Sequence, residues 1–315
     1  YFRRRGYLTV SDAPSPIPVT VIGGYLGAGK TTLVNNLLRQ ADGLRLAVLV
    51  NEFGALPIDA DLIESRDENM INIAGGCVCC SYGSDLIEAL KALQTLDTAP
   101  DHLLIEASGV ALPEAIAQST TLIARYTVDG IVVLADAETV RQHGTDKYLA
   151  DTIAHQLETA DIVLLNKTDL VAPDALDATR GWLDGHCAAA RIVATEKANV
   201  ALPVLLGARL ESLVSGASHN HPHAHHQSIV LRADSPVDPH ALADRLSDAA
   251  FALVRTKGFV TGQDGRTYAV QTVGRRATVA ATTQPVDVVG RIVCISAGSA
   301  IDQDALEAMV AALKD

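Results

Sequence analysis

Short apolar runs alternate with amphipathic segments along the first two thirds of the chain. Apolar runs lie at residues 17–22, 44–51, 102–106, 130–135 and 161–166. Segments with apolar residues at helical spacing separate them, as at Leu86, Ile87, Leu90 and Leu93. Continuous apolar runs are typical of strands buried on both faces, and their alternation with helices predicts a doubly wound, mostly parallel sheet.

The pattern changes near Glu211. Residues 215–227 are polar and contain Gly, Pro and His, so they cannot bury an apolar face and indicate a linker. Beyond it we expect a strand at 228–233, a helix at 239–253, β-rich runs between 259 and 295, and a closing helix with Leu306, Met309, Val310 and Leu313 on one face. We therefore predict an N-terminal tail at 1–16, an α/β domain at 17–212, a linker at 213–227 and a smaller α+β domain at 228–315.

Composition narrows the class of protein. The 315 residues are 48% hydrophobic but only 4% aromatic, which favours a core of Val, Ile, Leu and Ala under helices. The formal net charge of −12 argues against a nucleic-acid or anionic-membrane partner, because such binding depends on clustered Lys and Arg. The sequence has neither an apolar stretch of membrane-spanning length nor a signal-peptide hydrophobic region, so we expect a cytoplasmic protein.

A glycine-rich loop follows the first apolar run. Its sequence is Gly24-Tyr25-Leu26-Gly27-Ala28-Gly29-Lys30-Thr31, and residues 31–40 after it have the pattern of a helix. Glycines let backbone N–H groups converge on phosphates, the lysine reaches the β and γ oxygens, and the threonine hydroxyl binds Mg²⁺. The predicted phosphate-binding residues are Gly24, Gly27, Ala28, Gly29, Lys30, Thr31 and Thr32.

A base-recognition motif follows the run at 161–166. The motif is Asn166-Lys167-Thr168-Asp169, and its place after a buried strand is where a parallel sheet presents ligand-binding loops. The Asp169 carboxylate can accept hydrogen bonds from two N–H groups on one edge of guanine, whereas adenine has no matching pair of donors there. We therefore predict GTP as the nucleotide, with Asn166, Lys167 and Asp169 at the base.

Glu106 ends another apolar run, and we expect it to hold Mg²⁺ through water. The alternative is a strand-end carboxylate that faces solvent, which we consider weaker because Gly109 follows at a spacing that lets backbone approach a γ-phosphate. We predict Lys30, Thr31 and Glu106 as the catalytic residues. Residues 51–54 have the polar, glycine-terminated pattern of a switch loop. The sequence offers no assignable glutamine or arginine finger, so hydrolysis should be slow and stimulated by a partner.

Three cysteines lie within four positions, as Cys77-Val78-Cys79-Cys80. Thiolates select soft ions such as Zn²⁺ or Cu(I), and three of them leave one tetrahedral position for Glu52, water or a ligand from another protein. An inert buried thiol set, or a redox pair of Cys77 and Cys80, is the alternative. The predicted ligands are Cys77, Cys79, Cys80 and Glu52, whereas Cys187 and Cys294 are assigned to packing.

Histidines are concentrated in the predicted linker, at His219, His221, His223, His225 and His226. Neutral imidazoles at this density bind Zn²⁺, Co²⁺ or Ni²⁺, so we interpret the run as a secondary segment for loading or buffering metal. A solvated linker without metal is the alternative, and an affinity tag is disfavoured by the internal position of the run.

In combination these motifs resemble the CobW-like family of P-loop GTPases. That family includes zinc-regulated GTPase metalloprotein activators and cobalt-handling relatives, and it is similar to the accessory GTPases of urease and hydrogenase. The resemblance covers most of the chain and rests on residues 23–32, 51–54, 75–80, 106–109 and 166–169, with Arg255-Thr256-Lys257-Gly258 in the second domain. Relatives often carry an acidic residue where this chain has Ala55, which puts a surface metal site at that position in doubt.

The resemblance implies a metallochaperone that couples GTP hydrolysis to delivery of a transition metal. Zinc is the preferred cargo and cobalt the next. The expected partner is a client metalloprotein or metal-cofactor enzyme, and association between copies of the chain is left open. The alternatives are a regulatory GTPase that signals through its C-terminal domain and a metal buffer whose nucleotide site is secondary. A small-molecule kinase fits less well, because it would not need residues 166–169.

Overall fold

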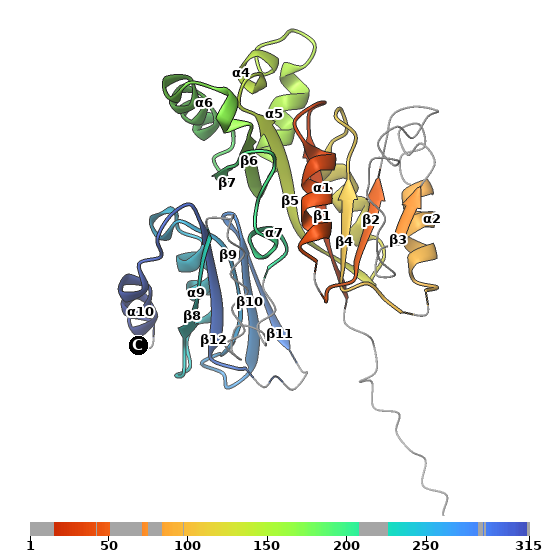
Figure 1. The fold of residues 1–315 in the computed structure, drawn as a ribbon. Helices are drawn as coiled ribbons and strands as arrows, with labels where there is room; N and C mark the ends of the chain where they lie inside the picture. The colour runs from red at the N-terminus through yellow and green to blue at the C-terminus, as the bar shows by residue number, and fades with distance from the viewer. Residues whose placement is uncertain are drawn as a thin grey trace, which may run out of the picture.

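The computed structural model describes residues 16–41, 43–50, 71–74, 84–96, 98–207, 226–282, 286 and 288–313. Within them the chain forms two sheets, each with its own helices (Figure 1). The first sheet has seven strands in the order β3-β2-β4-β1-β5-β6-β7, and every pairing in it is parallel. The strands are β1 (Ile17–Gly24), β2 (Leu46–Val50), β3 (Ile71–Ala74), β4 (His102–Glu106), β5 (Tyr126–Asp136), β6 (Ile162–Asn166) and β7 (Arg191–Ala194).

Helices cover both faces of this sheet. The helices are α1 (Lys30–Arg39), α2 (Ser84–Leu93), α3 (Pro113–Thr121), α4 (Val140–His143), α5 (Ala150–Glu158), α6 (Pro173–His186) and α7 (Leu202–Leu206). One face packs against apolar residues of α2, α3, α5 and α6, such as Leu90, Ile116 and Leu157. The other packs against α1 and α7, and also against Val254 and Ile295 of the second sheet. The predicted doubly wound fold is confirmed.

The second sheet is antiparallel and has the order β11-β10-β9-β12-β8. It is built from β8 (His226–Arg232), β9 (Leu253–Thr261), β10 (Thr267–Val273), β11 (Arg276–Thr282) and β12 (Arg291–Ala297), with helices α9 (Pro239–Leu246) and α10 (Gln303–Ala311). Both helices pack on the sheet around Leu242, Leu306 and Val310. This is the predicted smaller α+β domain, and its first strand begins at His226, two residues before the predicted boundary.

The predicted helix at 239–253 is wrong in its second half. Helix α9 ends at Leu246, and the Asp248 side chain then accepts a hydrogen bond from Ala250 N and begins a short 3-10 turn. Ala252 takes a left-handed conformation with φ of 50°, which redirects the chain into β9. Apolar residues continued through this stretch, so periodicity alone did not reveal the break.

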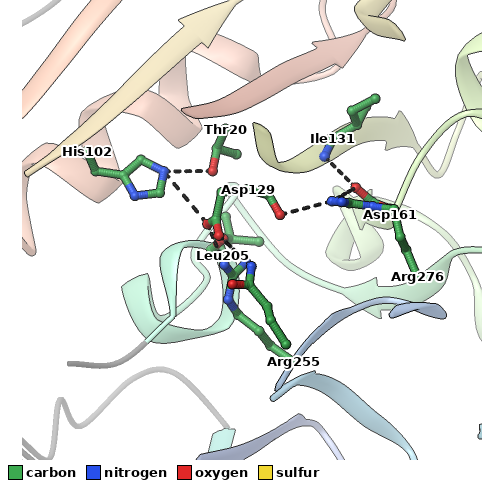
Figure 2. A network of polar contacts seen from close by, with 9 residues as sticks. Thr20, His102, Asp129, Ile131, Asp161, Leu205, Arg255 and Arg276 are labelled. Atoms are coloured by element: carbon green, nitrogen blue, oxygen red, sulfur yellow. Dashed lines mark hydrogen bonds and ion pairs between the residues drawn. The ribbon is translucent and has the colours of Figure 1, made fainter. Parts of the chain in front are cut away.

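The two domains meet through buried polar contacts (Figure 2). Asp129 lies at a bulge in β5, where the pairing with β1 skips it between Val19↔Val128 and Thr20↔Gly130. Its carboxylate forms an ion pair with Arg255 of β9 and accepts a 2.7 Å hydrogen bond from Gln271 Nε2 of β10. A bulge changes the direction of a side chain, and here it aligns Asp129 with the second domain.

A second carboxylate strengthens this junction. Asp161 accepts hydrogen bonds from Arg276 Nε at 2.8 Å and Arg276 Nη2 at 2.9 Å, and also one from Ile131 N. The first domain also supplies a donor: Arg191 of β7 donates hydrogen bonds to three carbonyl oxygens of the second domain, those of Leu253, Ser247 and Asp248. The second domain is therefore bonded directly to strands β5 and β7 as well as joined through the chain.

His102 lies next to Asp129 and is also buried (Figure 2). Its Nε2 is 2.8 Å from Thr20 Oγ1 and 3.9 Å from the Asp129 carboxylate. Burial lowers the pKa of His102 to about 4, with Asp129 opposing the shift and Arg255 and Lys257 adding to it. Burial alone raises the pKa of Asp129, but the Arg255 charge in particular brings it below its usual value. His102 is therefore neutral at pH 7, and Arg255 neutralises Asp129.

Candidate functional site

Four loops meet at the carboxyl edge of the first sheet. They follow β1, β4, β5 and β6, and these strands end at Gly24, Glu106, Asp136 and Asn166. Because all four strands are parallel, the sequence motifs that follow them come together at one edge.

The glycine-rich loop between β1 and α1 needs its glycines. Gly24, Gly27 and Gly29 have φ of 125°, 77° and 108°, in the range that side chains disfavour. A Cβ at Gly24 would lie 2.4 Å from Leu134 O, and one at Gly29 would lie 2.6 Å from Asn166 Nδ2. A Cβ at Gly27 would meet nothing within 4 Å, so the loop has one packed side and one open side. That shape fits a phosphate group, which takes its hydrogen bonds from the backbone.

Lys30 begins α1 and is 9% exposed. Its Nζ donates to Gly24 O at 2.9 Å and to Tyr25 O at 3.4 Å, so the ammonium group lies inside the curve of the loop. The predicted cation is therefore at the loop, next to the glycines that would receive the phosphates.

Thr31 and Glu106 are brought together from separate elements. Thr31 Oγ1 donates a 2.9 Å hydrogen bond to Glu106 Oε1, and Glu106 is 4% exposed. The contact follows from the fold, because β1 and β4 are neighbours with Ile22 opposite Glu106. A hydroxyl and a carboxylate are hard oxygen donors, so this pair fits Mg²⁺.

The segment after Glu106 lies against the glycine-rich loop. A Cβ at Gly109 would lie 2.8 Å from Leu26 N and 2.7 Å from Leu26 Cγ, so only glycine fits this approach. The Ser108 hydroxyl is buried and has no hydrogen-bond partner among the described residues. Ser108 belongs to the segment 106–109 but was not among the predicted site residues.

Asn166 connects the base motif to the phosphate loop. Its Nδ2 donates to Ala28 O at 2.8 Å and its Oδ1 accepts from Ala198 N at 2.7 Å, and the residue is 2% exposed. Both ends of the amide are thus bonded within the protein. Asp169 lies in a 3-10 turn, Thr168–Leu170, and is exposed to solvent. Of the two, Asp169 is therefore the residue accessible to a nucleotide base.

Lys167 has a left-handed backbone with φ of 62°, and its Nζ forms a 2.7 Å ion pair with Asp136 at the end of β5. This contact holds the base motif against the neighbouring strand. Sequence reasoning missed Asp136, although its place at the end of an apolar run is the same signal that identified Glu106. It also missed residues 195–202, which contact Asn166 and Thr168.

The predicted soft-metal ligands Cys77, Cys79, Cys80 and Glu52 lie outside the described residues, as do His219, His221, His223 and His225. Within the described part of the chain, no group of three or more His, Cys, Asp or Glu could hold a metal ion. Cys187 and Cys294 are buried, and burial raises the pKa of their thiols to about 11 and about 12. These two thiols have the buried surroundings expected of packing residues.

His226 belongs to β8 and faces a cleft of about 810 Å³ between the domains. Gln227 and residues 297–300 line one side, and residues 192–196 and 199–201 line the other. The last two residues of the predicted linker, His226 and Gln227, are therefore part of a strand and line this cleft.

Across the described residues, helices are too short or too polar to span a bilayer.

Comparison with known proteins follows the same division of the chain. The model of the CobW/HypB/UreG nucleotide-binding domain matches residues 18–194, and that of the cobalamin synthesis protein CobW C-terminal domain matches residues 226–314. The first match alone covers more than half of the chain.

Curated relatives match both domains. The zinc chaperone CobW of a Sinorhizobium species is 33% identical over 305 residues, which covers 82% of this chain and 86% of the relative. The zinc chaperone YjiA of Escherichia coli K12 is 34% identical over 275 residues, covering 80% and 85%. A crystal structure of Zn(II)-bound YjiA GTPase from E. coli is 23% identical with a TM-score of 0.48, covering 96% of this chain and 100% of that one.

Proposed function

This chain belongs to the CobW/HypB/UreG family and is a P-loop GTPase, and on that premise we propose that it is a metallochaperone that delivers zinc to a client metalloprotein. Cobalt is the second candidate for its cargo. The hydrogen bond between Thr31 and Glu106 is the main structural support for GTP hydrolysis, because it joins the end of the phosphate loop to the carboxylate at the end of β4. The metal half is supported by relatives named zinc chaperones and by the three cysteines.

Each residue of the phosphate site has a distinct role in the proposed reaction. The Lys30 ammonium would exchange its loop carbonyls for the β and γ oxygens of GTP. Thr31 and Glu106 would hold Mg²⁺, the threonine directly and the glutamate through water, and the ion would offset charge on the phosphates. The backbone of residues 24–29 would donate to the phosphates from its open side. Lys30→Ala should abolish triphosphate binding.

Base recognition is assigned to the motif at residues 166–169. Asp169 is exposed and would accept from the two N–H donors of guanine. Asn166 would act indirectly, since its amide is bonded to Ala28 and Ala198. Lys167 would keep the motif in place through Asp136.

The cargo site is assigned to Cys77, Cys79 and Cys80, with Glu52 as a candidate fourth ligand. These residues lie between the phosphate loop and the base motif in the sequence. Thiolates must be deprotonated to bind, and three of them leave a position through which a client could take the metal. The histidine run would supply weaker binding.

Metal stoichiometry and affinity with and without a nonhydrolysable GTP analogue would test the proposal. Allosteric coupling is typically about 1–3 kcal/mol, which is roughly 5–150-fold in affinity, and it is reciprocal. We expect the zinc dissociation constant to differ between the GTP-analogue and GDP states in wild type, and the tight zinc equivalent to disappear in a Cys77→Ser, Cys79→Ser, Cys80→Ser variant. Equal zinc affinities in the two states, with the cysteines confirmed as ligands, would contradict nucleotide-driven delivery and favour a metal buffer.

A further inference from the structure

Two amide side chains, Asn36 of α1 and Gln40 at the C-cap of that helix, hold a loop that lies far along the chain. Asn36 Nδ2 donates to Lys197 O at 2.9 Å and to Ala198 O at 3.0 Å. Gln40 Nε2 donates to Val200 O at 3.0 Å, and Gln40 Oε1 accepts from Leu202 N at 2.9 Å. Gln40 follows Asn36 by four positions and keeps a right-handed helical backbone at the C-cap, so the two side chains lie on the same side of α1. Residues 197–202 are therefore attached to α1 along their length.

The loop needs external support because its backbone is strained. Lys197 and Ala198 both have φ of 51°, so two successive residues with side chains take the left-handed conformation. Such a conformation persists only where the surroundings determine it. The surroundings here are the Asn36 amide, which binds both carbonyl oxygens, and Asn166, which binds the Ala198 N–H group.

The other side of the loop supports the base motif. Asn166 Oδ1 accepts from Ala198 N at 2.7 Å, and Thr168 Oγ1 donates to Thr195 O at 3.2 Å. Thr195 N in turn donates to Leu165 O, at the end of β6. A displacement of the loop would thus move the contacts that set the position of residues 166–169.

We propose that Asn36 and Gln40 are positioning residues for guanine selectivity. They hold residues 197–202, and through Ala198 and Asn166 the base motif, at a set place relative to Lys30 and Thr31 at the start of α1. One rigid helix thus places both the phosphate end and the base end of the nucleotide site. This inference rests on the proposed recognition of guanine by Asp169.

The experiment compares Asn36→Ala, Gln40→Ala and the double variant in the full-length chain. Steady-state hydrolysis of GTP, ITP and ATP would be measured for each. Gln118→Ala is the matched control, because Gln118 is an exposed helical amide whose side chain bonds within its own helix, to Glu114. Melting temperature is recorded for every protein to check that it is folded. If the double variant does not fold, the two single variants provide the comparison.

We expect the double variant to raise KM for GTP by about tenfold, as expected for the loss of two or more partly exposed hydrogen bonds, and to leave kcat nearly unchanged. The ratio of kcat/KM for GTP to that for ATP should fall by a similar factor, whereas Gln118→Ala should leave both unchanged. A general loss of fold would instead reduce turnover of all three nucleotides together.

The inference is overturned if folded variants keep the wild-type preference for GTP over ATP, or if kcat falls while KM does not change. A different result would count against the proposed function itself: a wild-type protein that does not prefer GTP over ATP has no guanine selectivity to position. The two failures are therefore distinguishable.

Discussion

Asp129 and Arg255 form an ion pair across the boundary between the two domains, and their side chains are 5% and 1% exposed. Arg255 Nη1 also donates to Leu205 O of α7 at 2.9 Å, so one guanidinium group binds both β5 and the helix that precedes the predicted linker. A buried charge is tolerated when a partner neutralises it, and here the partner comes from the other domain.

Removal of Arg255 should therefore destabilise the whole protein. Arg255→Met leaves the Asp129 carboxylate buried without its cation, and we expect a loss of about 3–5 kcal/mol in the free energy of unfolding. Asp129→Asn combined with Arg255→Met should recover part of the loss, because no buried charge remains. Urea denaturation would measure both. Arg266→Met is the control, since that arginine is 75% exposed and should contribute less than about 1 kcal/mol. An equal loss in the single and double variants would contradict this account.

His102 should make stability fall in mild acid. Its folded pKa is about 4, against 6.5 for the ordinary side chain, so the unfolded state binds a proton that the folded state excludes between these values. Stability is therefore present above pH 6.5 and lost as the pH falls toward 4, by about 3 kcal/mol at most.

The measurement is urea denaturation between pH 4 and 7, comparing wild type with His102→Gln. Glutamine retains a hydrogen-bonding group near Thr20 but does not titrate, so the variant should lose less stability over this range. His155→Gln is the control, because that imidazole is 42% exposed. Parallel pH curves for wild type and His102→Gln would refute the assignment.

Asp169→Asn should change nucleotide preference rather than abolish binding. The substitution replaces an acceptor with a donor, so GTP should bind more weakly and xanthosine triphosphate, which presents a carbonyl at that edge, should bind more tightly. Competition binding against a fluorescent nucleotide would show the exchange. Asp174→Asn, an exposed carboxylate at the start of α6, should leave preference unchanged. If Asp169→Asn binds both nucleotides as wild type does, Asp169 does not read the base.

The histidine run should bind metal weakly and with pH dependence. His219, His221, His223 and His225 can all be replaced by Ser, whereas His226 is kept because it begins β8. We expect the variant to lose metal equivalents that fade below about pH 6, where imidazoles protonate, and to keep the tight site and GTP hydrolysis. Titration calorimetry with Zn²⁺ at pH 5.5 and 7.5 would measure this. Loss of the tight equivalent would mean that the histidines hold the principal metal.

The sequence predicts the strands and helices that have a long apolar run or a clear helical period. It does not predict the short strands, which form because neighbouring strands hold them in the sheet. Residues 102–106 were predicted as a strand and form β4, because a continuous apolar run is buried on both faces. The short strands β3 and β7 have four residues each, too few to show a period.

In the candidate site, too, the residues with a local sequence motif were predicted and those held by distant contacts were not. The glycine-rich loop and the base motif have local signatures, and both lie at the carboxyl edge of the sheet. The loop at 195–202 has none: its conformation depends on Asn36, Gln40 and Asn166, which lie far from it in sequence. The pairing of Asp129 with Arg255 was likewise invisible, because a lone Asp at a bulge gives no periodic signal.

The contact of Arg276 with Asp161 has a practical consequence for any attempt to divide the protein. A nucleotide-binding fragment cut in the predicted linker would present two carboxylates, Asp129 and Asp161, without their arginine partners on the surface from which the second domain was removed. Exchange of C-terminal domains between relatives would succeed only where the incoming domain supplies matching cations. We therefore expect a substitution of Asp129 or Asp161 to require a matching change at Arg255 or Arg276.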